Sequence, residues 1–151
     1  NLGTTPESLA VSSELLKLGA NFRDLTANTM RNKSLASLKL WGRALERLRL
    51  DPKKGIAVTV LKDADFSECG ASADDAEGVA SLLNHLADVK MSMLLRELPD
   101  GTVKGSLRTT NELIDVSQVA TLMGGGGHAK AAGFTVKGRI AETEHGWKII
   151  E

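Results

Sequence analysis

The order of apolar and polar positions divides the chain into a helical first third and a mixed remainder. Thr5-Pro6-Glu7 is typical of a helix start, because a hydroxyl cap is followed by proline in the first turn and then by an acid. A second helical stretch is predicted from about Phe22 to Leu50. Its apolar face consists of Leu35, Leu38, Leu45 and Leu48. The turn-forming residues 51–55 end this helical part.

Short apolar runs separated by turn residues dominate the rest of the chain. Strands are predicted at residues 56–61, 89–97, 103–109 and 134–136, with a hairpin turn at Pro99-Asp100-Gly101. Helices are predicted from Asp74 through Leu86, at residues 115–123 with Asp115 as the cap, and as one small turn after residue 128. Residues 63–72 and the last dozen residues have no clear pattern. This order predicts an α/β fold, a mixed β-sheet flanked by helices and preceded by helical segments.

Composition restricts the class of protein. Hydrophobic residues make up 42% of the chain, enough for a core. The 19 basic and 19 acidic residues cancel, which argues against a generic basic coat for nucleic acid and favours a local anion site. Cys69 is the only cysteine, so an internal disulfide and a two-thiolate metal site are both excluded. There is no signal-peptide pattern and no membrane-length apolar run, so we expect a cytoplasmic protein that does not bind membranes.

The most informative segment is Gly124-Gly125-Gly126-Gly127-His128-Ala129-Lys130. Four consecutive glycines are costly in backbone entropy, and they indicate positive φ angles or a close approach to another group. Bare N–H groups, a predicted helical turn and two basic side chains together predict a phosphate site. The P-loop pattern does not fit, because Ala131 stands where the Mg²⁺-binding hydroxyl belongs, and the dinucleotide pattern lacks its third glycine.

Three segments together resemble the DHH-associated substrate-binding domain of the DHH-family phosphoesterases. They are Gly105–Thr109, Asp115–Ser117 and Gly124–Phe134, the last containing the family's glycine triplet with histidine followed by Ala-Ala-Gly-Phe. Residues 75–78 and 94–97 are similar to segments of the oligoribonuclease and exopolyphosphatase-like branch.

The resemblance covers residues from about 26 to 137 and implies a domain organisation. Residues 1–25 are expected to be the tail of the preceding DHH catalytic domain, 26–54 a linker helix, and 55–151 the DHH-associated domain.

The resemblance further implies that this chain binds substrate while catalysis belongs elsewhere. The Asp-His-His motif that names the family is absent, and the three histidines are scattered at positions 85, 128 and 145. We therefore expect no catalytic residue, metal ligand or cofactor in this chain, and Mn²⁺ or Mg²⁺ in a catalytic domain that it lacks. The chain would then be a fragment or processed product of a longer hydrolase and inactive alone.

The predicted substrate site follows from residue chemistry within that resemblance. Its members are Ser106, Arg108, Gly124, Gly125, Gly126, Gly127, His128 and Lys130. Arg108 has the planar fork suited to a phosphate, and strand alternation puts Ser106 on its face. His128 can donate one hydrogen bond, and Lys130 adds a point charge. A structural ion pair remains the alternative for Arg108, and a solvated position for Lys130.

The expected partners are short single-stranded RNA or DNA or a phosphorylated nucleotide, together with the chain's own DHH catalytic domain; a homodimer stays open. Oligoribonucleotide, single-stranded DNA, cyclic dinucleotide, pAp-like nucleotide and polyphosphate all remain candidate substrates. Two tryptophans, three phenylalanines and no tyrosine do not predict an extended base-stacking platform. The alternative functions are a stand-alone nucleotide or nucleic-acid binding module without catalysis, and a regulatory or oligomerisation domain.

Overall fold

The computed structural model describes residues 4–21, 23–24, 33–144 and 146–150, in two units, 1–33 and 34–151. In the first unit, α1 (Pro6–Lys17) begins where the sequence predicts. The Thr5 hydroxyl accepts from the Ser8 N–H at 3.2 Å, and the Ser8 hydroxyl accepts from the Thr5 N–H at 2.9 Å. These two bonds satisfy backbone donors that a helix start leaves unpaired.

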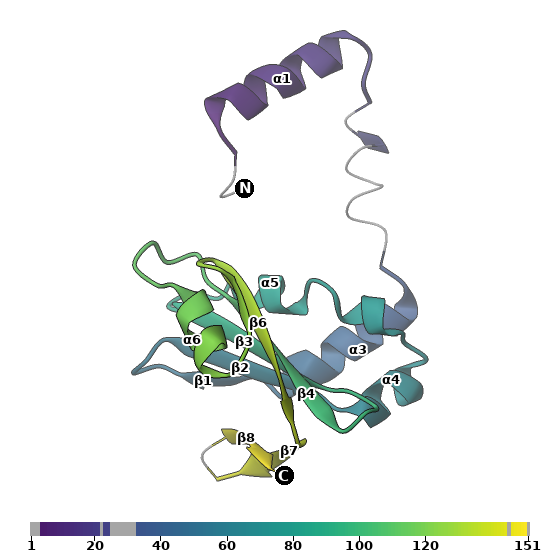
Figure 1. The fold of residues 1–151 in the computed structure, drawn as a ribbon. Helices are drawn as coiled ribbons and strands as arrows, with labels where there is room; N and C mark the ends of the chain where they lie inside the picture. Colours follow the sequence, from purple (N-terminus) through teal and green to yellow (C-terminus); the bar gives the residue numbers. More distant parts are fainter. Residues whose placement is uncertain (1–3, 22, 25–32, 145, 151) are drawn as a thin grey trace. The chain divides into compact units, whose positions relative to one another are not determined.

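The second unit is built on a six-stranded sheet with the order β1-β2-β3-β4-β6-β5 (Figure 1). Its strands are β1 (Arg49–Asp51), β2 (Ile56–Leu61), β3 (Met91–Glu97), β4 (Thr102–Arg108), β5 (Gly126–His128) and β6 (Ala131–Lys137). Strands β2 and β3 are parallel and every other neighbouring pair is antiparallel. The predicted mixed sheet flanked by helices is confirmed.

Helices cover one face of this sheet only over its first half. Helix α3 (Leu35–Glu46) packs on β2 and α5 (Val79–Leu83) packs on β3, while α4 (Asp63–Cys69) and the 3₁₀ helix η1 (Ala73–Ala76) pack against α3. The buried apolar core between them consists of Leu40, Ala44, Leu61, Ala76, Val79, Ala80 and Leu94. On this face α5 also contacts β4, and these helices contact β6 and β5 little.

The opposite face carries the larger core. Helix α6 (Val116–Leu122) packs on β5 and β6, and the hairpin of β7 (Arg139–Thr143) and β8 (Gly146–Ile150) contacts β2, β3 and β4. Its buried members are Val60, Met91, Leu95, Val103, Leu107, Val116, Ala120, Ala132, Phe134 and Ile140. Along β4, Val103, Gly105 and Leu107 therefore face this core, and Lys104 and Ser106 face the opposite side.

The prediction of a helix that runs to Leu50 is wrong in two respects: where the helix ends and which of its faces is buried. Helix α3 ends at Glu46, and residues 49–51 form β1 instead. Leu35, Leu38 and Leu45 are exposed, whereas Ser37, Leu40 and Ala44 are buried. Part of that predicted helix, residues 22 and 25–32, lies outside the described residues.

Other differences occur where distant contacts decide the local structure. Residues 63–69, predicted to be irregular, form α4, and the predicted helix from Asp74 to Leu86 is interrupted at Gly78, whose φ is +92°. The turn after His128 is a two-residue connection between β5 and β6 rather than a helical turn. Residues 139–143 and 146–150 form the β7–β8 hairpin. The boundary between the two units falls after residue 33, and the predicted domain boundaries at 25 and 54 stay predictions.

Candidate functional site

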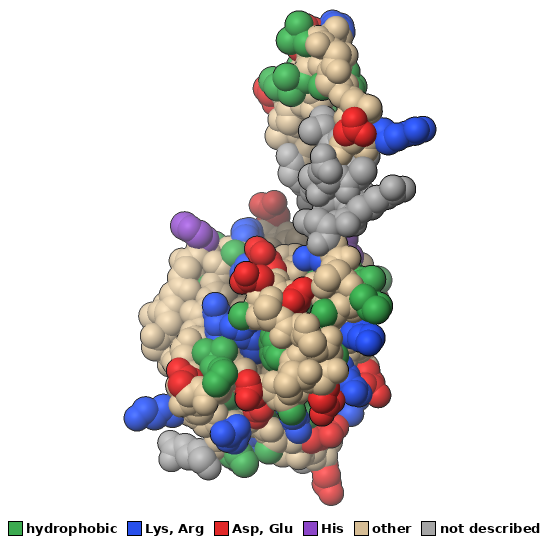
Figure 2. Space-filling model, turned by 90° about the vertical axis from the view of Figure 1, so that its right-hand side faces the viewer, with side chains coloured by type: hydrophobic (Ala, Val, Ile, Leu, Met, Phe, Trp, Pro, Cys, Tyr) green, Lys and Arg blue, Asp and Glu red, His purple; other side chains and the backbone are tan. Residues whose placement is uncertain are grey.

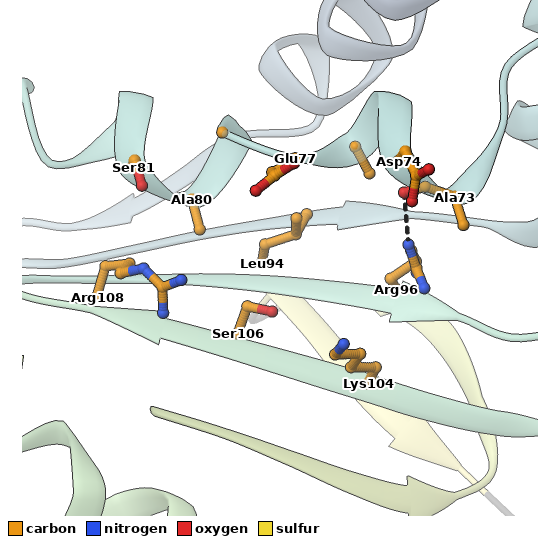
Figure 3. Close-up of a pocket in the computed structure, with 12 residues that line it drawn as sticks. Ala73, Asp74, Glu77, Ala80, Ser81, Leu94, Arg96, Lys104, Ser106 and Arg108 are labelled. Atoms are coloured by element: carbon orange, nitrogen blue, oxygen red, sulfur yellow. Dashed lines mark hydrogen bonds between the residues drawn. The ribbon is translucent and has the colours of Figure 1, made fainter. Parts of the chain in front are cut away.

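Strands β3 and β4 form one side of a cavity of about 410 Å³ (Figure 3). The floor is defined as the cavity-facing side chains of β3 and β4, and the wall as residues 73–81, which run from η1 into α5. The floor consists of Leu94, Arg96, Lys104, Ser106 and Arg108, and the wall contributes Ala73, Asp74, Ala76, Glu77, Gly78, Ala80 and Ser81.

Strand alternation brings the predicted Ser106 and Arg108 together, as expected. Both side chains line the cavity, whereas Thr109 is 4% exposed and its hydroxyl donates to the Lys90 carbonyl at 2.6 Å. The same alternation places Lys104 on the floor, and its partner across the hairpin, Arg96, lies beside it. Sequence reasoning missed Lys104, although the period of two was enough to find it.

The floor is cationic, and no carboxylate within the described part of the chain forms an ion pair with its three basic side chains. Arg108 donates from Nη1 to the Leu107 carbonyl at 3.0 Å. Arg96 donates to the Ala73 carbonyl at 3.0 Å and lies over the Phe66 ring. The alternative of a structural ion pair for Arg108 is therefore not realised among these residues.

The wall is held in place from behind by Asp75. Its carboxylate accepts hydrogen bonds from the Ser72 N–H at 2.7 Å, the Ser37 hydroxyl at 2.8 Å and the Ser34 hydroxyl at 3.1 Å. The Ser72 backbone bond, followed by the serine hydroxyls, holds the pKa of Asp75 well below its usual range. This network fastens η1 to the N-terminal turn of α3.

Trp41 and Gly78 complete the attachment of the wall. The Trp41 indole donates to the Asp75 carbonyl at 2.9 Å. A Cβ at Gly78 would lie 3.0 Å from the Trp41 ring, at a φ of +92° that favours glycine. Glycine at this position therefore lets the wall turn back over the sheet directly after Glu77.

The glycine run is packed more tightly than a free phosphate loop. The N–H groups of Gly124 and Gly125 donate to Thr121 and Ala120 carbonyls at 3.0 and 2.8 Å, so they end helix α6. A Cβ at Gly127 would lie 2.6 Å from the Ala132 Cα in β6. The expectation of bare N–H groups in the glycine run does not hold for Gly124 and Gly125. The role of the glycines in binding stays a prediction.

His128 and Arg108 lie in one row across three strands. His128 pairs with Ala131 of β6, and Ala131 pairs with Arg108 of β4. Directly paired residues point to the same face of a sheet, and neighbouring strands lie about 4.8 Å apart, so the two Cα atoms are about 10 Å apart. The small Ala131 between them leaves the surface open. This row extends the cationic floor to an exposed histidine at the sheet edge.

Lys130 lies at the tip of the β5–β6 hairpin and outside the cavity lining. Its ammonium group donates to the Asn111 carbonyl at 2.6 Å and to the Ile114 carbonyl at 3.4 Å. The structure thus gives Lys130 a role in holding the loop before α6, and its contact with a ligand stays a prediction.

Charges of both signs are interspersed over the face of the domain seen in Figure 2. Among the described residues, no three His, Cys, Asp or Glu side chains gather where they could hold a metal ion. No helix in the described ranges has the length and apolar composition needed to cross a membrane.

The fold and the glycine–histidine hairpin define an α/β domain of the DHH-associated type. Residues 53–145 match the DHHA1 domain family, and the chain belongs to this family. The resemblance and the fold class predicted from the sequence are both confirmed.

Curated relatives and a solved structure agree with this assignment. The chain is 31% identical over 135 residues to the bifunctional oligoribonuclease and PAP phosphatase NrnA of Thermus thermophilus, which covers 89% of this chain and 39% of that protein. It is 48% identical over 42 residues to oligoribonuclease NrnB of Bacillus subtilis, covering 28% of this chain and 10% of that one. An exopolyphosphatase-related protein from Bacteroides fragilis has a TM-score of 0.79 at 25% identity, over 87% of this chain and 38% of its own. This chain thus spans well under half the length of these proteins.

Proposed function

We propose that this chain is the substrate-binding part of a metal-dependent phosphodiesterase that degrades short oligonucleotides or related phosphorylated nucleotides. The observation that carries the proposal is the row of Arg108, Ala131 and His128 beside a cavity with three basic side chains. The similarity to an oligoribonuclease and PAP phosphatase supports this substrate class.

In this proposal the chain binds and orients the substrate. Arg108 presents two parallel N–H groups to phosphate oxygens, Lys104 adds a point charge, and His128 donates one hydrogen bond at the edge of the sheet. Within the described part of the chain, no carboxylate forms an ion pair with the basic side chains of the floor, so these side chains can still attract a phosphate at close range.

The catalytic metals, Mn²⁺ or Mg²⁺, are proposed to belong to a DHH catalytic domain rather than to this chain. The described residues do not fit a metal centre, because they offer no cluster of His, Cys, Asp and Glu ligands. The reaction itself is therefore assigned to that other domain, with this chain as its partner in substrate binding.

Arg108→Ala tests the binding role directly. Because charge-assisted hydrogen bonds are worth about 1.5–3 kcal/mol, we expect about tenfold to a hundredfold weaker binding of a 5′-phosphorylated RNA tetranucleotide, measured by titration calorimetry. His128→Ala should weaken binding less, because its side chain is exposed and at the sheet edge. Arg139→Ala is the matched control, since Arg139 is an exposed arginine of β7 outside this cavity. Wild-type affinity of Arg108→Ala would contradict the proposal.

A further inference from the structure

The cavity carries acids as well as bases, and the acids lie on the wall. Asp74 and Glu77 line the same 410 Å³ space as the three floor cations. A site shaped only for inorganic phosphates gains nothing from these carboxylates, because each repels a phosphate. The charge arrangement instead fits a ligand that has an anionic group and, next to it, hydrogen-bond donors.

No aromatic side chain is among the twelve residues that line the cavity. Proteins that read unpaired bases stack them on aromatic rings or arginine planes, and here the aromatic part of that platform is missing. The donors closest to a nucleotide's phosphate are the hydroxyl groups of its ribose. In dinucleotide-binding domains an Asp or Glu accepts hydrogen bonds from these hydroxyls while other groups hold the phosphates.

Glu77 is the wall carboxylate placed for this task. Its backbone is extended, with the N–H donating to the Asp74 carbonyl at 3.0 Å, and Gly78 turns the chain against Trp41 directly after it. Figure 3 shows the Glu77 side chain reaching from the wall over Leu94, near the end of the cavity that holds Ser106 and Arg108. Asp74 lies at the other end, beside Arg96.

We propose that Glu77 accepts hydrogen bonds from the ribose hydroxyls of a nucleotide whose phosphate is held by Arg108. The inference rests on the proposed function and deepens it, because it names ribonucleotides as the preferred class. Deoxyribonucleotides lack the 2′-hydroxyl that Glu77 accepts from, and polyphosphate offers no sugar. The site therefore distinguishes RNA from DNA by the sugar and is tolerant of base identity.

Binding of three probes to the full 151-residue chain tests this assignment. The probes are 5′-phosphorylated RNA and DNA tetra-adenylates and inorganic tripolyphosphate, each measured by titration calorimetry. We expect the RNA to bind about tenfold more tightly than the DNA. This ratio corresponds to the free energy of one hydrogen bond to a charged acceptor. Glu77→Ala should bring the two affinities together and should strengthen tripolyphosphate binding, because a repelling charge is removed. Glu77→Gln should give an intermediate ratio and guards against misfolding of the alanine variant.

Asp74→Ala is the matched control, because it removes the same charge from the Arg96 end of the cavity. It should leave the RNA-to-DNA ratio unchanged. Three results would each overturn the inference. The wild-type chain could bind RNA and DNA equally, the Glu77 variants could lose affinity for RNA and DNA equally, or tripolyphosphate could bind as tightly as RNA. If Arg108→Ala still weakens both nucleic acids, the proposed function stands despite such a result. If Arg108→Ala changes neither affinity, the proposed function fails as well.

Discussion

Gly125→Ala is expected to separate strand β5 from the sheet and to displace His128 from its row with Arg108. The added methyl group would lie 2.6 Å from the Phe134 Cα and 2.7 Å from its Cβ, and it would also overlap the Gly133 carbonyl oxygen. These atoms belong to β6, which is paired on both edges, so it cannot move aside. Overpacking of this kind costs about 1–3 kcal/mol, and the upper end applies because backbone atoms are involved. Urea denaturation measures the loss, and amide hydrogen exchange at residues 126–128 locates it.

Gly126→Ala is the matched control for this substitution. The neighbouring glycine has no atom within 4 Å of an added Cβ and no left-handed φ. Its alanine variant should stay within about 0.5 kcal/mol of the wild-type stability. Equal destabilisation by the two substitutions would show that the glycine run is required for flexibility and not for close packing on β6.

The same glycines show where sequence reasoning reaches its limit. Four glycines in a row correctly indicated a close approach, but the sequence does not reveal which group is approached. Local chemistry suggested a free phosphate loop, whereas the partner of Gly125 is a strand eight or nine residues away. The register of β5 on β6 decides this, and register depends on the whole sheet.

Elements with strong local signals were predicted well. The hairpin at Asp100-Gly101 and the cap of α6 at Asp115 depend on residues within three positions of each other. The position of Ser106 and Arg108 on one face follows from strand alternation alone. Arg96 was not predicted as a site residue, because its place on the floor depends on the pairing of β3 with β4, where it lies opposite Lys104.

Helix α3 shows how a distant polar partner can override an apolar pattern. Its leucines predicted one buried face, yet Ser37 faces inward because its hydroxyl bonds to Asp75, 38 residues later. From the sequence alone, Asp74, Asp75 and Glu77 are explained as acids in the first turn of a helix, where they complement the helix dipole. In the structure Asp75 anchors the wall, while Asp74 and Glu77 line the cavity, and no local signal separates these roles.

Helix α4 is held against α3 by an ion pair that the sequence does not predict. Arg47, the C-cap of α3, donates through both terminal nitrogens to the Asp65 carboxylate, which also accepts from the Lys62 N–H at 2.6 Å. The Asp65 side chain is 3% exposed and that of Arg47 23%. Burial opposes ionisation of Asp65, but the bonds from Arg47 and Lys62 outweigh it and hold the pKa below its usual range.

Asp65→Ala is therefore expected to destabilise the domain by about 3 kcal/mol, because it leaves a half-buried guanidinium and a backbone N–H without their acceptor. Glu68→Ala is the control on the same helix: Glu68 pairs with Arg43 at 3.3 Å, but both side chains are largely exposed, at 57% and 43%, so its loss should cost under about 1 kcal/mol. The pKa of Asp65 is lowered by folding, so its contribution is complete above the ordinary carboxyl pKa of about 3.9 and is lost as pH falls below it. Urea denaturation from pH 6 toward pH 3 should show the gap between wild type and Asp65→Ala closing, while the small Glu68→Ala difference changes little. A gap that stays constant over this range would mean that Asp65 stabilises α4 by packing and not by its charge.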